Sequence, residues 1–377
     1  MLITAAILAI FVYGLIAAML GTILPGLSKR FSLTPRQNGK IALAQALGLM
    51  IASVAVGPLI DNQGKKVGLV LGLGLAAVAL FALPRSKGYR YIVVCLLLLG
   101  LGGGVIVTGA NALVSEIGAE RRATMMNLLN LFFGLGGLAT PLLLANLLGG
   151  NSTRLCYLVA VLTAATLILN GAAPIPPPTG ERGFQFSQAG QFLGHPALWL
   201  LALMLFLYVA CEVGVWNWLA RHLIAQGIDE KRALNILSLG FALGMLIGRV
   251  AASQILTAVA PETVTLAAAV LMAITTYLAL QTKAPAVTWV AVFCAGLAMA
   301  PVFPTTLAMV GNVFTVATAT AMGIVITAGW LGLVVSSPVI GAIAGEDPRR
   351  LRKALLLLPA FSVLMVVVNL ILRGVLR

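Results

Sequence analysis

Residues 123–148 read ATMMNLLNLFFGLGGLATPLLLANLL, and residues 320–345 read TAMGIVITAGWLGLVVSSPVIGAIAG. Aligned without a gap, the two stretches match at positions of similar size or polarity: Met125 with Met322, Asn130 with Thr327, Phe133 with Trp330, Thr140 with Ser337, and Pro141 with Pro338. We interpret them as an internal repeat. In a membrane protein, such a repeat indicates two similar bundles with a substrate site at their interface.

The composition supports a membrane protein. Of the 377 residues, 60% are hydrophobic and 9% are charged, and the mean hydropathy is +1.06. A soluble fold must cover its core with polar surface, and this chain has too little. The net charge of +14 comes from Lys and Arg residues set singly or in small groups between apolar segments, so lipid headgroups are expected partners and nucleic acid is not.

Spanning helices need about 20 mainly apolar residues, and the sequence predicts an all-α integral membrane fold of twelve. Their predicted ranges are 3–27, 41–60, 67–84, 91–114, 123–148, 155–173, 196–220, 234–257, 264–281, 287–311, 318–344 and 353–373. Prolines and polar residues between the sixth and seventh spans cannot continue a helix. We therefore predict an N-terminal six-helix bundle (1–173), a cytoplasmic linker (174–195) and a C-terminal six-helix bundle (196–377).

The segment joining the second and third spans is GPLIDNQGKK, residues 57–66. It resembles the loop signature of the major facilitator superfamily, although Asn62 stands where that family has a basic residue. In the superfamily this loop is cytoplasmic and latches one conformation, which implies an inner-membrane protein with both termini cytoplasmic. With both termini cytoplasmic, roughly 16 of the 24 Lys and Arg residues lie outside and roughly 8 inside. This is the reverse of the positive-inside rule, so charge counting alone favours the opposite orientation.

Other segments narrow the resemblance to the fucose/galactose/glucose:proton symporter family. They are residues 39–45, TGAN at 108–111, ERRA at 120–123, YVACEV at 208–213, GR at 248–249 and APVFPT at 300–305. This resemblance implies a sugar carrier with coupling carboxylates in the first and fourth helices. Gly21 and Val107 occupy those positions, which favours a uniporter.

Counting depth at about 1.5 Å per residue puts five side chains near the middle of the membrane: Tyr13, Asn130, Phe133, Thr327 and Trp330. Asn127 shares a helix face with Asn130, three residues on. Amides and hydroxyls suit a neutral hydroxylated substrate, and an indole face can stack on a sugar ring. The alternative is that these groups form interhelical hydrogen bonds.

Glu212 is the only acidic residue well inside a predicted span, and Tyr208 and Trp216 lie one turn on either side of it. A carboxylate in hydrocarbon is costly, so Glu212 should face a wet cavity or a partner. It can accept hydrogen bonds from a sugar, exchange a proton, or play a structural role. Depth counting puts Arg249 toward the opposite side of the membrane, which makes Arg249 a poor static partner.

Gln45 and Asn111 complete the predicted substrate-binding set. Pro301 and Pro304 should bend the tenth helix, which suits a gate. The predicted gating residues are Gly57, Asp61, Gly64, Lys65, Lys66, Arg121, Arg249, Pro301 and Pro304. His222 is expected in a solvated loop after the seventh span.

The sequence therefore predicts a monomeric carrier that moves a neutral, glucose-like monosaccharide by alternating access. No metal, cofactor or catalytic residue is expected, because no nucleotide-binding loop, metal cluster or nucleophile-base pair appears. Two alternatives stay open: a proton-coupled symporter that uses Glu212, and an exporter of apolar small molecules. A membrane enzyme is disfavoured.

Overall fold

The computed structural model describes residues 2–177, 193–282, 284–345 and 348–376. Most of the predicted linker lies outside the described residues. Twelve helices among those described are long and apolar enough to cross a membrane, which confirms the predicted number of spans.

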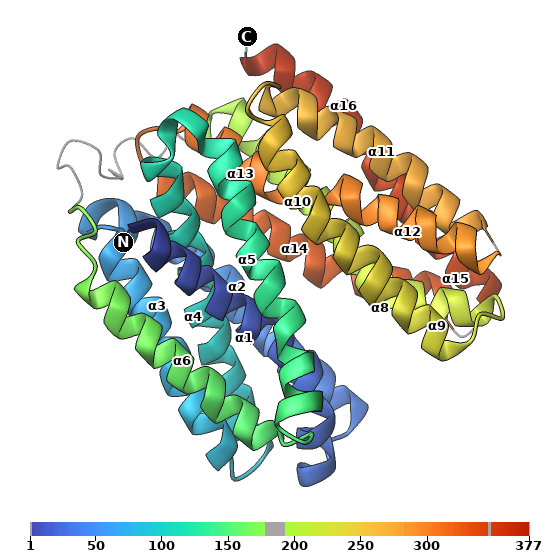
Figure 1. The fold of residues 1–377 in the computed structure, drawn as a ribbon, viewed down its shortest axis with the longest axis horizontal. Coiled ribbons are helices and arrows are strands. Elements are labelled where there is room, and N and C mark those ends of the chain that lie inside the picture. The colour runs from blue at the N-terminus through green and yellow to red at the C-terminus, as the bar shows by residue number, and fades with distance from the viewer. Residues whose placement is uncertain (1, 178–192, 283, 346–347, 377) are drawn as a thin grey trace. The chain divides into compact units, whose positions relative to one another are not determined.

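The first six spans are built from α1 (Leu2–Phe31), α2 (Pro35–Gln63), α3 (Lys65–Ala82), α4 (Tyr89–Ile117), α5 (Arg122–Leu142) and α6 (Ser152–Ala172). The other six are built from α8 (Pro196–Ala225), α9 with α10 (Glu230–Asn235, Leu243–Ile255), α11 (Pro261–Gln281), α12 with α13 (Pro285–Met299, Val302–Val313), α14 (Thr318–Ala344), and α15 with α16 (Pro348–Leu355, Leu357–Leu376). Figure 1 shows these helices, and a π-helical segment, Ile236–Ala242, joins α9 to α10.

Most helices extend past their predicted ends, because polar residues at the membrane surface still satisfy their backbone groups within a helix. The start of α2 is an example. Thr34 and Gln37 form a reciprocal capping box there, and it stabilises a helix that begins six residues before the predicted residue 41. The tenth span is interrupted between Met299 and Val302, where Pro301 cannot donate a helical hydrogen bond. A bend from Pro301 and Pro304 was predicted in this span, and the structure interrupts the helix at Pro301.

By backbone proximity the chain forms two compact units. The first unit comprises Met1–Glu120, Leu129–Gly190 and Phe314–Thr327; the second comprises Arg121–Leu128, Gln191–Val313 and Ala328–Arg377. Two helices are thereby shared. The first turns of α5 belong to the second unit, and the first turns of α14 belong to the first unit. The division into bundles at residues 173 and 196 stays a prediction.

The repeat found in the sequence has a structural counterpart inside each unit. In the first unit, Thr140 of α5 donates to the carbonyl of Leu15 on α1 at 2.9 Å. In the second, the matching residue of α14, Ser337, accepts from Asn217 at 2.7 Å and from Trp218 at 3.2 Å, both on α8. The same repeat position therefore joins α5 to α1 and α14 to α8.

Buried asparagines in the sixth and twelfth spans also join helices. Asn170 on α6 donates to the carbonyl of Ala5 on α1 at 3.3 Å, and Asn369 on α16 donates to Thr265 on α11 at 2.7 Å. Both asparagines are fully buried. Hydrogen bonds between spans stabilise helix association where lipid offers no hydrophobic driving force.

Candidate functional site

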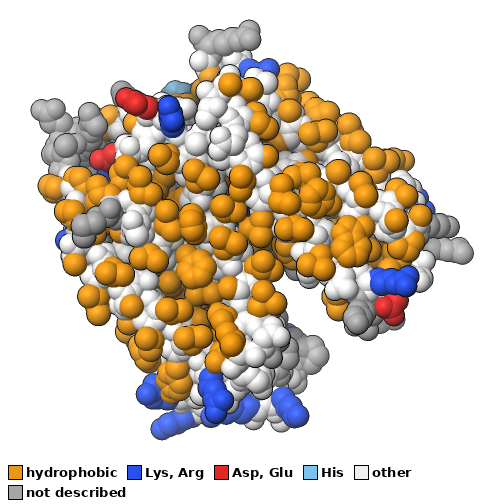
Figure 2. Space-filling view, viewed as in Figure 1, with side chains coloured by type: hydrophobic (Ala, Val, Ile, Leu, Met, Phe, Trp, Pro, Cys, Tyr) orange, Lys and Arg blue, Asp and Glu red, His pale blue; other side chains and the backbone are white. Residues whose placement is uncertain are grey.

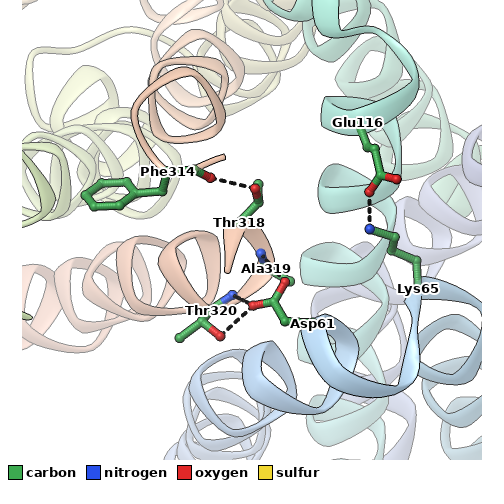
Figure 3. Close-up of polar contacts among 7 residues, drawn as sticks. All are labelled: Asp61, Lys65, Glu116, Phe314, Thr318, Ala319 and Thr320. Carbon is green, nitrogen blue, oxygen red and sulfur yellow. Dashed lines mark hydrogen bonds and ion pairs between the residues drawn. The ribbon is translucent and has the colours of Figure 1, made fainter. Parts of the chain in front are cut away.

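Asp61 near the end of α2 caps the start of α14 inside the first unit. Its carboxylate accepts from the backbone N–H of Ala319 at 3.0 Å, and from the N–H and hydroxyl of Thr320 at 2.8 and 2.6 Å (Figure 3). Helix N-terminal amides are unpaired within the helix and favour negative charge. Ala317, just before α14, has a left-handed backbone with φ of 57°, so the chain accepts local strain where it turns into this contact.

The two lysines of the loop signature are also engaged. Lys65 forms an ion pair with Glu116 on α4 (Figure 3), and Lys66 donates to the carbonyl of Ala173, at the end of α6, at 3.1 Å. Gly64 has φ of 96° between α2 and α3, a conformation that favours glycine. The 57–66 segment thus fastens α14, α4 and α6 at one end of the first unit.

Above this cap, α2 and α14 approach closely through small residues. A Cβ atom on Gly57 would lie 2.5 Å from the Cα of Thr320 and 2.9 Å from the carbonyl oxygen of Ala319. One on Gly323 would collide with the Ser53 carbonyl. Further along, the Thr327 hydroxyl donates to the Met50 carbonyl at 3.2 Å. In the structure, Thr327 therefore makes the interhelical hydrogen bond that the sequence left open as an alternative.

The first unit also holds a cluster of polar and aromatic residues at the middle of its helices. Tyr13 and Phe133 stack with ring centroids 5.4 Å apart, and the Asn130 amide donates to the Asn111 side-chain oxygen at 3.3 Å. Asn111 also donates to its own helix at Val107, at 2.7 Å. These contacts bring together predicted residues from three different spans. Tyr13, Asn111 and Asn130 are buried, whereas Phe133 is not.

Gln45, the sixth predicted substrate-binding residue in this unit, is largely buried on α2. It lies nearly three turns into the helix, not one turn in as predicted, because α2 begins at Pro35. A Cβ atom on Gly100 of α4 would collide with the Gln45 carbonyl, so α4 and α2 touch at this point.

The shared first turns of α5 carry three polar contacts inside the second unit. Asn127 donates to the Thr305 hydroxyl of α13 at 3.1 Å, and Thr124 donates to the carbonyl of Ser253 on α10 at 3.1 Å. Arg122 also donates to the side-chain oxygen of Asn312. Asn127 and Asn130 thus share a helix face but are bonded within different units.

A second cluster surrounds Glu212 on α8. The Glu212 side chain lies beside Tyr208 and Trp216, and it interacts electrostatically with the guanidinium of Arg249 on α10. The expectation that Arg249 is a poor static partner of Glu212 stays a prediction. Trp216 packs edge-on against Phe241, with centroids 5.2 Å apart, and Tyr208 packs against Phe303 at 6.5 Å.

The remaining predicted residues are placed as follows. Pro301 and Pro304 are buried at the break between α12 and α13, Arg121 is exposed, and Trp330 is partly exposed on α14. His222 does not lie in a solvated loop. It is buried in the last turns of α8, beside Gln226 and the Leu280 carbonyl, because α8 extends five residues past its predicted end.

Several contact residues were missing from the predicted sites, among them Thr124, Ser253, Glu116 and Thr320. Single hydroxyls in apolar segments carry little signal, because most such groups bond to their own helix. Thr305 could have been found from the repeat. Each repeat copy follows an apolar span that becomes polar near its end, and Thr305 lies at such an end.

Twelve candidate spans among the described residues, arranged in two compact units with buried polar clusters, indicate a multi-pass membrane protein. The family model of the Major Facilitator Superfamily matches residues 6–337, and the chain belongs to that superfamily. Several of its relatives and structural neighbours carry transporter names.

Among curated relatives, the Bacillus subtilis glucose/mannose transporter GlcP is 28% identical, over 64% of this chain and 62% of that protein. A Brucella abortus glucose/galactose transporter is 27% identical, over 65% and 64%. The yeast "Bypass of stop codon protein 6" is 22% identical, over 65% and 55%. The chain therefore matches less than two thirds of the length of each of these relatives.

Solved structures agree on the fold. FucP, an Escherichia coli fucose:proton symporter, superposes with a TM-score of 0.85 at 18% identity, covering 98% of both chains. The proton:xylose symporter XylE superposes with a TM-score of 0.81 at 14% identity, covering 97% of this chain and 94% of XylE.

Proposed function

We propose that this transporter carries a neutral monosaccharide across the membrane by alternating access. The observation that carries the proposal is the cluster of Tyr13, Phe133, Asn111 and Asn130 in the first unit. Carboxamides both donate and accept, as sugar hydroxyls do, and aromatic faces suit the C–H face of a pyranose. None of these four side chains is charged, so the cluster favours an uncharged solute.

The names of the relatives support the substrate class. Two of them are called glucose/mannose and glucose/galactose transporters, and the fold neighbours include fucose and xylose symporters. We accordingly propose a glucose-like hexose as the substrate. The second unit would contribute Tyr208, Glu212, Trp216, Asn127 and Trp330 to recognition.

Uniport is the proposed mode of transport. Gly21 and Val107 occupy the positions where the resembling symporters carry coupling carboxylates, and neither residue can hold a proton. A Cβ atom on Gly21 would meet nothing within 4 Å, so packing does not explain the absence of a side chain there. Without those groups, a sugar would move down its own gradient.

Proton symport is the second candidate, and Glu212 is the observation that favours it. This carboxyl group lies among Tyr208, Trp216 and Arg249, an arrangement in which a carboxyl could exchange its proton for an interaction with the arginine. Glu212 is part of both candidates, as a hydrogen-bond acceptor for sugar in the first and as a proton carrier in the second.

Gating is proposed to involve the two shared helices. Motion of one unit against the other must break the α14 contacts in the first unit, break the α5 contacts in the second, or bend these helices. The α14 contacts centre on Gly57 and Asp61; the α5 contacts centre on Asn127. Lys65, Lys66, Gly64, Arg121 and the break at Pro301–Pro304 would support the same change, with Arg249 released from Glu212. We further propose a monomer in a bacterial inner membrane, with both termini cytoplasmic.

Tracer uptake into proteoliposomes tests the proposal. A panel of neutral sugars is assayed with and without a pH gradient, using the wild-type chain and Glu212→Gln. Uniport predicts equilibration without a gradient and no uphill uptake with one. Uphill uptake driven by a pH gradient and abolished in Glu212→Gln would favour the symporter. Transport of apolar compounds without any sugar uptake would refute both.

A further inference from the structure

One end of the first unit is strongly basic. Eight Lys and Arg residues from the α1–α2, α3–α4 and α5–α6 connections and the adjoining turns lie there, and all eight are exposed: Lys29, Arg30, Arg36, Lys40, Arg85, Lys87, Arg90 and Arg154. We call this set the basic end. The sequence has no Asp or Glu in residues 26–41, 83–91 or 143–155. Figure 2 shows blue side chains gathered at the lower edge of the view.

Contacts between the connections hold these charges in one place. Arg30 donates to the Pro84 carbonyl at 3.2 Å, which joins the first connection to the second. Arg85 lies over the ring of Tyr157 on α6, 5.4 Å from its centroid. A Cβ atom on Gly26 would lie 2.9 Å from the Ser152 hydroxyl, so α1 reaches the start of α6. Neither carbonyl nor ring neutralises a positive charge.

The opposite end of the same unit differs. There Lys65 is paired with Glu116, and Asp61 caps a helix. At that end a lysine is paired with a carboxylate of the protein, whereas the residues of the basic end have no carboxylate in their own connections. Like charges in proximity repel one another, so counterions must come from outside the chain.

Apolar side chains adjoin the basic residues. Leu43 is 44% exposed one turn from Lys40, and Tyr91, next to Arg90, is 42% exposed. Leu147, in the connection that leads to Arg154, is 74% exposed. Basic residues beside apolar and tyrosine side chains at the ends of spanning helices mark the level of the lipid headgroups. A soluble polyanion would satisfy the charges but would leave this apolar surface uncovered.

We propose that the basic end binds acidic phospholipids, with the headgroup phosphates against the Lys and Arg residues and the acyl chains along α2 and α4. Binding would order the three connections around shared anionic headgroups. The proposal does not depend on which solute the protein carries.

The test is the melting temperature of the purified full-length chain in neutral detergent, titrated with phosphatidylglycerol or phosphatidylcholine. Phosphatidylglycerol should raise the melting temperature saturably, phosphatidylcholine should not, and 0.5 M NaCl should weaken the effect. The triple variant Lys29→Gln/Arg36→Gln/Lys40→Gln should need about tenfold more phosphatidylglycerol for the same rise. These three side chains have no recorded role in the proposed sugar site.

The matched control removes three exposed charges from the second unit: Arg221→Gln/Arg232→Gln/Lys353→Gln. It should keep a near-wild-type response. An equal loss in both triple variants, or an equal rise with phosphatidylcholine, would overturn the proposal. A soluble polyanion such as polyglutamate that reproduces the whole rise would show counterion binding without lipid recognition. If the first triple variant does not fold, the comparison of phosphatidylglycerol with phosphatidylcholine and the effect of NaCl, both measured on the wild-type chain, still test the proposal.

Discussion

At the scale of single residues, the chain uses one buried carboxylate as a helix cap. Asp61 reaches three donors at the start of α14, at 2.6 to 3.0 Å. Hydrogen bonds to charged groups are stronger than those between neutral groups. One side chain on α2 therefore fixes the position at which a helix more than 250 residues later in the chain begins.

Replacing this cap should cost stability. Asp61→Ala is expected to lower the free energy of unfolding by about 2 kcal/mol, because two helix amides lose a charged acceptor. Asp61→Asn keeps one oxygen acceptor and should lose less. Thermal melting in detergent measures both, and Asn62→Ala, the exposed neighbour, is the control. A melting temperature of Asp61→Ala equal to wild type would show that the contact contributes nothing.

The Asn130–Asn111 pair belongs to the same scale. Asn130→Ala should raise the KM for sugar uptake about tenfold, since one or two hydrogen bonds of roughly 1 kcal/mol each are lost. Asn146→Ala is the control, because Asn146 is exposed and donates only to the Leu142 carbonyl one turn back in its own helix. Unchanged uptake and KM in both Asn130→Ala and Trp330→Ala would show that the proposed site does not bind the sugar, even though the protein transports it.

At the scale of elements, small residues set how closely two spans approach. Gly57 on α2 faces the backbone of α14, with no room for a methyl group, whereas a Cβ atom on Gly74 of α3 would meet nothing within 4 Å. Lipid does not drive helices together as water does, so close packing itself supplies much of the attraction. The two glycines therefore have different roles.

This contrast gives a paired test. Gly57→Ala should destabilise the protein by about 1–3 kcal/mol, because α14 must shift to admit the methyl group. Gly74→Ala should be neutral, or stabilising by up to about 1 kcal/mol. Melting temperature and sugar uptake are measured for both variants. Equal behaviour of the two would show that the α2–α14 approach is not a tight contact in the membrane.

At the scale of the whole molecule, transport by alternating access requires the two units to move. The Asn127 amide and the Thr305 hydroxyl are 3.1 Å apart. In a chain without its four native cysteines, oxidised Asn127→Cys/Thr305→Cys should transport at less than about a tenth of the reduced rate, because the first turns of α5 could no longer leave α13. Reducing agent should restore uptake. Full transport by the cross-linked protein would exclude separation at this contact.

Orientation is also a property of the whole molecule. The superfamily resemblance predicts that a green fluorescent protein fused to the C-terminus folds and fluoresces in the cytoplasm, and that alkaline phosphatase fused there is inactive. The excess of Lys and Arg residues in the opposite connections predicts the reverse. An active phosphatase fusion would show that charge, and not family resemblance, sets the topology of this chain.

Much of the architecture was readable from the sequence. Long apolar segments predicted twelve spans, and the repeat predicted that α5 and α14 would be equivalent, as their matching Thr140 and Ser337 contacts bear out. The 57–66 signature singled out Asp61, which accepts from the first amides of α14. These predictions succeeded because hydrocarbon forces every backbone group into a helix, so length and hydropathy alone determine the elements.

Tertiary structure decided which polar groups meet. Thr327 and Asn127 form the helix contacts that the sequence left open as an alternative. His222 is buried, although the sequence predicted a solvated loop. Each depends on helix tilt, side-chain reach and the partner that a helix selects. The sequence by itself determined that the chain lies in a lipid bilayer, how many spans it has and that its helix arrangement is repeated, because these properties follow from the local pattern of side chains. The pairing of buried polar groups followed only from packing, because a hydrogen bond depends on distances between residues that the chain keeps far apart in sequence.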